Sequence, residues 1–417
     1  MIKRKLFKEL KGHIQRKEIS FIIGPRQAGK TTLMLLLKEH LEKNNKKTIF
    51  FNLDIESDKK FFNSQDGLIA KIRLEIGQDS GFVFIDEIQR KQDAGLFLKG
   101  LYDMNLPYKF IVSGSGSMEL KEKIHESLLG RKRVFELSTV SFDEFVDFRT
   151  GYKYQGRLSD FFSIDKEKTA AFLEEYMNFG GYPSVVLEEK LTEKRKAIDE
   201  IYRSYIEKDI SYLLKIRKTE DFSNLVRLMS AQTGNLVNIF EISSTLGISQ
   251  KTVKDYLWYL EKTYILKKAA PYFKNPRKEI TKSPVFYFYD IGLKNYASGV
   301  FGGILGPKEA GFSFQNLIFN ILNECFRESS AKIHFWRTKD KAEVDFVVDL
   351  GKEVVPVEVK YKALKEPHIA RPIRNFIERY HPRKAFVINL ELEKALSIAG
   401  TKIFFIPFYE AMKKMAE

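Results

Sequence analysis

The sequence contains few thiol and imidazole groups. It has one cysteine, Cys325, in 417 residues, and its six histidines are scattered along the chain. A lone cysteine cannot form an internal disulfide, so we expect a reducing compartment. The histidines show no metal-ligand spacing, which argues against a zinc site. These absences favour a cytoplasmic protein.

Long apolar runs are also absent. No apolar stretch is long enough to cross a bilayer, and no apolar segment with a cleavage site follows the basic start Met1–Lys5. We therefore expect no membrane partner. Hydrophobic residues make up 44% and aromatics 13% of the chain, so sizeable cores can form and extensive disorder is excluded. A length of 417 residues predicts two to four domains.

Basic residues outnumber acidic residues by 70 to 55, which gives a net charge of +15. Three windows, 1–17, 262–282 and 360–384, together hold 22 basic and four acidic residues. The rest of the chain is close to neutral. This distribution favours a polyanionic partner such as DNA, and a merely basic, soluble surface is the alternative.

The first third of the chain alternates short apolar runs with helical patterns. We predict strands at 19–23, 48–52, 81–85 and 109–112. Continuous apolar strands separated by helices are typical of a parallel sheet that is covered on both faces.

A phosphate-binding loop follows the first predicted strand. Residues 24–31 match G-x-x-x-x-G-K-[ST] in full, and a helix begins near Lys30. Loop N–H groups and the helix N-terminus would hold phosphates, with Lys30 on the β- and γ-phosphates and the Thr31 hydroxyl on Mg²⁺. The predicted ligand is ATP, with contacts from Gly24, Pro25, Arg26, Gln27, Ala28, Gly29, Lys30, Thr31 and Thr32.

Two carboxylates end the third predicted strand, at the edge where open α/β sheets bind ligands. Asp86 would complete the Mg²⁺ shell, and Glu87 would polarise the attacking water as general base. A solvated acidic turn is the alternative.

Two further groups could act on the γ-phosphate. Ser113, with Ser115 as second choice, ends the fourth strand and could sense this phosphate, although a plain glycine–serine loop fits equally well. Arg131, or Arg133 in its place, could stabilise transition-state charge from its own or a neighbouring subunit. A solvated basic turn is the alternative for the arginine.

The middle of the chain is mostly helical from about 141 to 230, with an interruption at Gly180–Pro183. Residues 239–260 predict a helix–turn–helix, in which Gly247 suits the turn and Ser249 caps the second helix. Residues 267–282 resemble a wing. DNA contact is one interpretation and contact with another domain or subunit is the other. The second helix should bury Val253, Leu257 and Leu260 and present Gln250, Lys251 and Lys254 to a major groove.

A β-hairpin is predicted near the C-terminus, from 342–349 and 353–361. Glu358 and Lys360 leave the same face of the second strand, and Asp345 lies on the first. Asp345 and Glu358 could hold Mg²⁺ or Mn²⁺ while Lys360 orients the attacking water. These three groups are the ones that metal-assisted phosphodiester cleavage requires. Pro356 should mark an edge, a bulge or the start of a strand.

As a set, these motifs resemble the prokaryotic AAA-type ATPases that carry a DUF4143 region. The resemblance spans nearly the whole chain and implies an ATPase core at 1–140, a helical lid at 141–232, a winged helix at 233–303 and a nuclease-like domain at 304–417. It implies no settled biological role. The motifs are the phosphate loop, Ile85–Gln89, Ser113–Ser115, Leu129–Arg131, Ser141–Phe145, Gly180–Pro183, Tyr205–Ile210, Phe286–Leu293 and Trp336–Asp340.

The C-terminal hairpin resembles the PD-(D/E)XK nuclease pattern with one departure. In that family the preceding helix usually carries two glutamates, whose positions here are Gln315 and Ile321. Less negative charge weakens cation binding, although Gln315 still offers an oxygen. A working nuclease, a nuclease-like fold without activity, and a hairpin with exposed acidic and basic residues all remain open.

The sequence thus predicts an α/β protein with a P-loop parallel-sheet ATPase core, a helical lid, a winged-helix domain and a C-terminal α/β restriction-endonuclease-like domain. The expected function is a Mg²⁺-dependent ATPase coupled to DNA binding or processing. The alternative is an ATP-dependent regulatory or signalling switch whose C-terminal domain is inactive and binds DNA or protein. Homo-oligomers and protein partners stay open.

Overall fold

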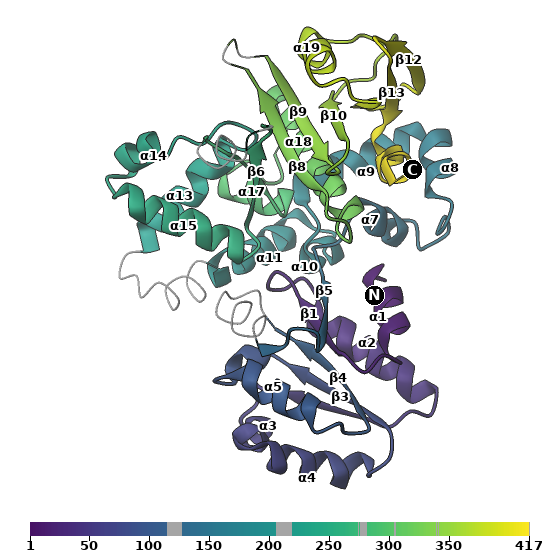
Figure 1. Cartoon of the computed structure of the whole chain (residues 1–417), viewed down its shortest axis with the longest axis vertical. Coiled ribbons are helices and arrows are strands. Elements are labelled where there is room, and N and C mark those ends of the chain that lie inside the picture. The colour runs from purple at the N-terminus through teal and green to yellow at the C-terminus, as the bar shows by residue number, and fades with distance from the viewer. Residues whose placement is uncertain are drawn as a thin grey trace. The chain divides into compact units, whose positions relative to one another are not determined.

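The computed structural model describes residues 1–114, 127–205, 219–273, 275, 282–303, 306–338, 340 and 342–416. The chain divides into two compact units (Figure 1). The first contains residues 1–151, 181–217 and 258–265, and the second contains 152–180, 218–257 and 266–417. Each unit is built around one β-sheet.

The first unit has a five-stranded parallel sheet in the order β2-β3-β4-β1-β5. The parallel sheet and the four expected strands are confirmed. The sequence did not predict β5, in which only Phe135 is buried, because charged residues at an edge give little apolar pattern. The strands are β1 (Ile19–Ile23), β2 (Thr48–Asn52), β3 (Gly81–Asp86), β4 (Tyr108–Ser113) and β5 (Lys132–Glu136).

Apolar helix faces cover this sheet. Leu33 and Leu37 of α2 pack with Phe82 and Phe84 of β3 and with Phe135 in one core cluster. Val83 and Ile85 alternate with these phenylalanines and so face the opposite side of the sheet. Among the described residues before β5, the helices of this unit are α1 (Leu6–His13), α2 (Lys30–Lys43), α3 (Glu56–Lys59), η1 (Lys60–Asn63), α4 (Gln65–Ile76), η2 (Ile88–Arg90) and α5 (Ala94–Asp103).

Helices follow β5, as the sequence predicts. The first unit includes α7 (Phe142–Arg149), α10 (Pro183–Leu187) and α11 (Leu191–Arg203). The second includes α8 (Leu158–Ile164), α9 (Lys166–Phe179), α13 (Thr219–Ala231), α14 (Ile239–Leu246), α17 (Ile291–Ala297), α18 (Pro307–Cys325), α19 (Arg371–Tyr380), η4 (Phe408–Glu410) and α20 (Ala411–Ala416). Across the described ranges, we find no helix that combines the length and the apolar character needed to traverse a bilayer.

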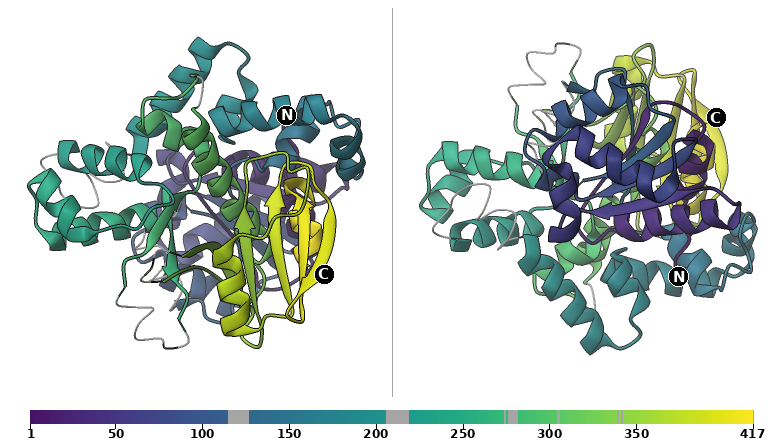
Figure 2. Two further views of the ribbon diagram at one scale, coloured as in Figure 1. Left: turned by 90° about the horizontal axis from the view of Figure 1, so that it is seen from above. Right: turned by 90° about the horizontal axis from the view of Figure 1, so that it is seen from below.

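The second unit has an eight-stranded mixed sheet in the order β12-β13-β11-β10-β9-β8-β6-β7. Figure 2 shows its green-to-yellow strands side by side. The expected hairpin is present, because β9 and β10 pair antiparallel. The strands are β6 (Leu266–Pro271), β7 (Val285–Phe288), β8 (Lys332–Arg337), β9 (Glu343–Asp349), β10 (Val354–Val359), β11 (Lys384–Asn389), β12 (Lys394–Ile398) and β13 (Thr401–Pro407).

Pro356 does not lie on an edge strand, so that part of the prediction is wrong. It lies inside β10, which has β9 on one side and β11 on the other. The Lys360 N–H donates to the Ile388 carbonyl of β11, and backbone groups two residues apart along a strand point the same way. The Pro356 nitrogen therefore faces β11, where pairing begins only at Val357, and no ladder hydrogen bond is lost.

The two expected helices and the turn between them occur at α14 and α15 (Gln250–Lys262). Gly247 ends α14 with a left-handed φ of 65°, and the Ser249 hydroxyl caps α15 by accepting the Thr252 N–H at 3.0 Å. The β6–β7 hairpin follows and pairs with β8, so strands on both sides of the boundary predicted at 303/304 share one sheet. Residues 274 and 276–281 of the predicted wing lie outside the described residues.

Two glycine-containing motifs interlock in the second unit. Gly180 has a φ of 71°, and a Cβ on it would overlap with the Asp290 carboxylate and the Gly292 nitrogen. A Cβ on Gly292 would in turn overlap with the Phe179 carbonyl. Asp290 caps α17 through the Leu293 N–H at 2.9 Å. The two segments approach so closely that neither position has room for a Cβ atom, which explains why both residues are glycines.

We predict that Gly180→Ala destabilises the second unit more than Gly299→Ala does. Gly299 also has a positive φ, 78°, but nothing lies near its missing Cβ. A positive φ alone costs alanine about 1 kcal/mol, which corresponds to roughly 2–4 °C in Tm. Overlap adds about 1–3 kcal/mol at Gly180. Thermal unfolding should therefore show at least twice the loss for Gly180→Ala, and equal losses would contradict the interlock.

Candidate active site

The loop between β1 and α2 has the backbone that its glycines predict. Gly24 and Gly29 have φ values of 150° and 94°. A Cβ on Gly24 would overlap with the Leu137 carbonyl, so the loop packs directly against the residue that follows β5. Gly29 is the N-cap of α2, and the first N–H groups of that helix consequently open at the loop.

The Lys30 side chain lies within this loop. Its ammonium donates to the carbonyl oxygens of Pro25 at 2.7 Å and Gly24 at 3.1 Å. The residue is 6% exposed. A buried ammonium within this loop, beside the N-terminus of α2, concentrates positive charge where a phosphate would bind.

Asp86 connects three parts of the sheet edge. Its Oδ2 accepts the Thr31 hydroxyl at 2.7 Å, and its Oδ1 accepts the Ser113 hydroxyl and, at 3.2 Å, the Glu87 N–H. The aspartate is 1% exposed. The loop, β3 and β4 are therefore joined through one buried carboxylate, and three of the predicted site residues surround it.

Glu87 has an unusual backbone for a glutamate, with a left-handed φ of 57°. Its N–H also donates to the Ser113 hydroxyl at 3.3 Å, and its carboxylate accepts the Gln89 amide. Burial, and then the negative charge of Asp86, raise the pKa of Glu87 above its usual range. Strained backbones of this kind cluster at functional sites, where they aim a side chain.

A cleft of about 650 Å³ lies beside these residues. This volume is within the range of ligand-binding sites. The phosphate loop forms one part of its wall, and the segment from Pro183 to Ser204 in α10 and α11 forms another. Its lining residues are Arg26, Gln27, Gly29, Lys30, Thr31, Thr32, Asp54, Glu87, Arg90, Pro183, Ser184, Leu187, Glu200, Arg203 and Ser204.

Two arginines that line the cleft were not predicted as site residues from the sequence. Arg90 pairs with Asp54 at 2.6 Å, and Arg203 pairs with Asp199 at 2.9 Å. Both guanidinium groups are suited to phosphate oxygens. Arg90 lies just beyond the Asp86–Glu87 pair, which is a usable local signal. Arg203 is remote in sequence, so no local pattern could have identified it.

Arg131 is not brought to the cleft, which corrects the interpretation that it acts within its own chain. It precedes β5, whose first residue, Lys132, pairs with Ile19 at the start of β1. The phosphate loop follows the other end of β1. Arg131 instead binds Asp103 at 2.8 Å. Action from a neighbouring subunit stays a prediction. Ser115 lies outside the described residues.

The predicted C-terminal residues do lie together. The Asp345 carboxylate accepts the Gln315 amide and the Val359 N–H, each at 2.7 Å. Lys360 donates to Glu358 at 2.7 Å. Burial and the nearby Glu358 raise the pKa of Asp345 to about 8. Desolvation lowers the pKa of Lys360, but Glu358 outweighs it and the net shift is upward.

This C-terminal cluster has few carboxylates for a metal site. In the part of the chain that the structure describes, no three His, Cys, Asp or Glu side chains are grouped to hold a metal ion. Ile321, six residues beyond Gln315 in α18, adds no ligand atom. One oxygen, Glu358 Oε2, is buried and has no hydrogen-bond partner among the described residues.

The second helix of the helix–turn–helix presents the face that the sequence predicts. Val253, Leu257 and Leu260 are buried. Gln250, Lys251 and Lys254 are exposed along its first turns.

Three families match consecutive parts of the chain. An AAA domain covers residues 16–146, a domain of unknown function (DUF8612) covers 171–302, and another (DUF4143) covers 310–410. Among similar curated proteins, an uncharacterised protein of Haemophilus influenzae is 23% identical over 408 residues, 94% of this chain and 95% of its own. One of Methanocaldococcus jannaschii is 24% identical over 383 residues, 90% and 81% of the two chains.

Similar solved structures include Cdc6p from Pyrobaculum aerophilum, with a TM-score of 0.29, 12% identity and coverage of 72% of this chain and 94% of that one. AMPPCP-bound DnaA from Aquifex aeolicus has a TM-score of 0.26, 14% identity and coverage of 71% and 92%.

The AAA match coincides with the parallel sheet and the phosphate loop, and the DUF4143 match coincides with α18 and most of the C-terminal strands. With both domains present, the chain is an AAA-type ATPase of the DUF4143-containing family.

Proposed function

We propose that this protein is a Mg²⁺-dependent ATPase that couples ATP binding and hydrolysis to DNA binding. The observation that supports the ATPase half is the grouping of Lys30, Thr31, Asp86, Glu87 and Ser113 beside one cleft. The alternative is an ATP-dependent signalling switch. In that case the middle and C-terminal parts bind another copy of this chain or a different protein instead of DNA.

The residues fit a magnesium ion at one point. The Thr31 hydroxyl and an Asp86 carboxylate oxygen are 2.7 Å apart, and oxygen atoms of these kinds are the ligands that Mg²⁺ accepts. Thr31 and Asp86 would therefore hold the ion. When bound, it would neutralise charge on the phosphates.

The chain's own groups account for the rest of the reaction. Lys30 would bind the β- and γ-phosphates, and the loop N–H groups would hold their oxygens. Glu87 would take the proton of the attacking water, for which its carboxylate must be ionised. Ser113, through its bonds to Asp86 and the Glu87 N–H, would fix the Asp86 carboxylate relative to the Glu87 backbone.

Two substitutions separate binding from turnover. We expect Lys30→Ala to abolish ATP binding, because the only ammonium enclosed by the loop in the described residues is removed. Glu87→Gln should bind ATP within about threefold of wild type and lose about 10²–10⁴-fold in turnover, the usual contribution of a general base. Calorimetry and phosphate release measure the two effects. Normal hydrolysis by Glu87→Gln would refute the assignment of the base.

The DNA half of the proposal is supported by exposed basic residues at the start of α15. Lys251 and Lys254 are exposed on the helix that a helix–turn–helix protein inserts into the major groove. The backbone turn at Gly247 and the β6–β7 hairpin agree with that arrangement.

Removal of both lysines should weaken DNA binding in a salt-dependent way. We expect Lys251→Ala/Lys254→Ala to reduce the slope of log K against log salt by about 2, because each phosphate contact contributes about 0.9. Fluorescence anisotropy with a short duplex measures this slope. The control is Lys46→Ala/Lys47→Ala, two exposed lysines of the first unit. An equal effect of the two pairs would contradict a specific surface on α15.

DNA cleavage is a second candidate function, favoured by the unpartnered Glu358 Oε2. The Asp345 contacts oppose it, because Gln315 supplies an amide donor where a further carboxylate would attract a cation. We therefore expect plasmid DNA to stay intact with Mn²⁺ and ATP. Mn²⁺-dependent cleavage that is abolished by Asp345→Ala or Lys360→Ala would instead establish the nuclease.

A further inference from the structure

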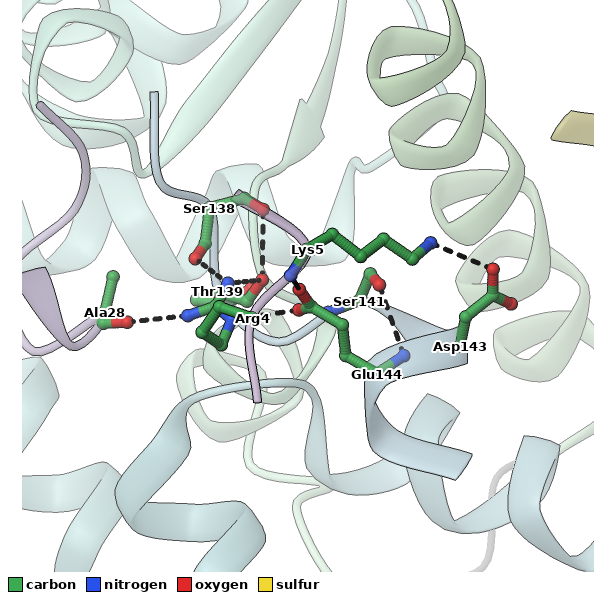
Figure 3. Close-up of polar contacts among 8 residues, drawn as sticks. All are labelled: Arg4, Lys5, Ala28, Ser138, Thr139, Ser141, Asp143 and Glu144. Atoms are coloured by element: carbon green, nitrogen blue, oxygen red, sulfur yellow. Dashed lines mark hydrogen bonds and ion pairs between the residues drawn. The ribbon is translucent and has the colours of Figure 1, made fainter. Parts of the chain in front are cut away.

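Arg4 is a buried arginine beside the phosphate loop (Figure 3). Its side chain is only 7% exposed. The Nη1 group donates to the Ala28 carbonyl at 2.9 Å, and Nη2 donates to the carbonyls of Ser138 at 2.7 Å and Thr139 at 3.1 Å. One guanidinium thus joins the start of the chain, the phosphate loop and the segment after β5.

Glu144 holds this guanidinium in place. Its Oε2 accepts Arg4 Nε at 2.9 Å and the Ser141 N–H at 3.1 Å, and its Oε1 accepts the Lys5 N–H at 2.6 Å. The Ser141 hydroxyl in turn accepts the Glu144 N–H, which completes a capping box at the start of α7. A carboxylate with this many fixed donors has little freedom, so the position of Arg4 is well defined.

The Ala28 contact acts on a peptide that borders the cleft. Gly29 lines the cleft, whereas Ala28 is completely buried and its carbonyl accepts the Arg4 guanidinium. In a trans peptide the C=O and the following N–H point in opposite directions. A hydrogen bond that holds the Ala28 carbonyl toward Arg4 therefore holds the Gly29 N–H away from Arg4, on the side of the cleft.

We propose that Arg4 is a positioning residue for the phosphate loop, which orients the Gly29 N–H toward a nucleotide phosphate. The inference rests on the nucleotide site proposed above. Lys30 directly follows Gly29 and is the residue expected at the β- and γ-phosphates. We therefore expect the oriented Gly29 N–H to donate to the β-phosphate rather than to the α-phosphate.

Only an arginine can make this set of contacts. Its planar group presents five donors in a fixed fork, while a lysine ammonium is a single point with three donors. Arg4→Lys can keep the ion pair with Glu144 but cannot also reach Ala28, Ser138 and Thr139. Arg4→Gln carries no charge and is the second variant, in case a lysine is not accommodated.

The test compares ADP with AMP by calorimetry on the full chain. We expect either Arg4 variant to lower the ADP affinity about tenfold and the AMP affinity less than twofold. Lys5→Gln, which alters the exposed pair with Asp143 on the same segment, should change neither. Glu144→Gln should lower Tm and shift the ADP-to-AMP ratio in the same direction as the Arg4 variants but less, because it weakens the group that holds Arg4 while the guanidinium remains.

The outcomes separate positioning from a purely structural role. An Arg4 variant with a lower Tm and an unchanged ADP-to-AMP ratio would overturn the proposal, as would equal losses for both nucleotides. Wild-type binding that is abolished in Lys30→Ala verifies the nucleotide site independently. Failure of the wild-type chain itself to bind ADP would overturn both proposals.

Discussion

The buried carboxylate of Asp86 is the interaction on which the site depends. A carboxylate that is 1% exposed must be matched by donors, or its burial costs several kcal/mol. Here the donors are the Thr31 and Ser113 hydroxyls and the Glu87 N–H. These groups come from α2, from β4 and from the residue that follows β3. The need of one buried carboxylate for donors therefore fixes the edge of the sheet where the phosphate loop opens.

Basic residues near the N-terminus also contact the phosphate loop and the segment after β5, although the charge distribution alone suggested that they bind a polyanion. The window 1–17 contributes to the basic excess, but Arg4 is enclosed by carbonyl groups and Glu144. Lys5 pairs with Asp143. Part of the N-terminal basic charge is therefore used within the first unit and is not available to a polyanion. The exposed lysines of α15 are better candidates for that purpose.

Most of the parallel sheet could be predicted from the sequence because its strands are short apolar runs with turn residues between them. The phosphate loop and Asp86 were found for a related reason, since their spacing along the chain fixes their geometry. The β9–β10 hairpin and the turn at Gly247 were also predictable, because each depends on neighbouring residues. All of these features are local.

The features that sequence reasoning missed depend on contacts between distant residues. Arg131 precedes β5, and because that strand runs parallel to β1, its first residue pairs with the end of β1 that is remote from the phosphate loop. A short basic motif carries no information about the direction or register of that strand pairing. Arg203 reaches the cleft from a helix far along the chain. The position of Pro356 became interpretable only when its neighbour β11 was known. The position of each of these residues depends on contacts between elements that are distant in the sequence.

The proposed function joins an ATP site to a DNA-binding surface, and coupling between two ligands must be reciprocal. The most direct measurement is the Kd of one DNA duplex for the wild-type chain, first with ADP and then with a non-hydrolysable ATP analogue, at one salt concentration. We expect the two Kd values to differ by about fivefold or more, the lower end of typical coupling. Equal Kd values in the two nucleotide states would contradict coupling between nucleotide binding and DNA binding.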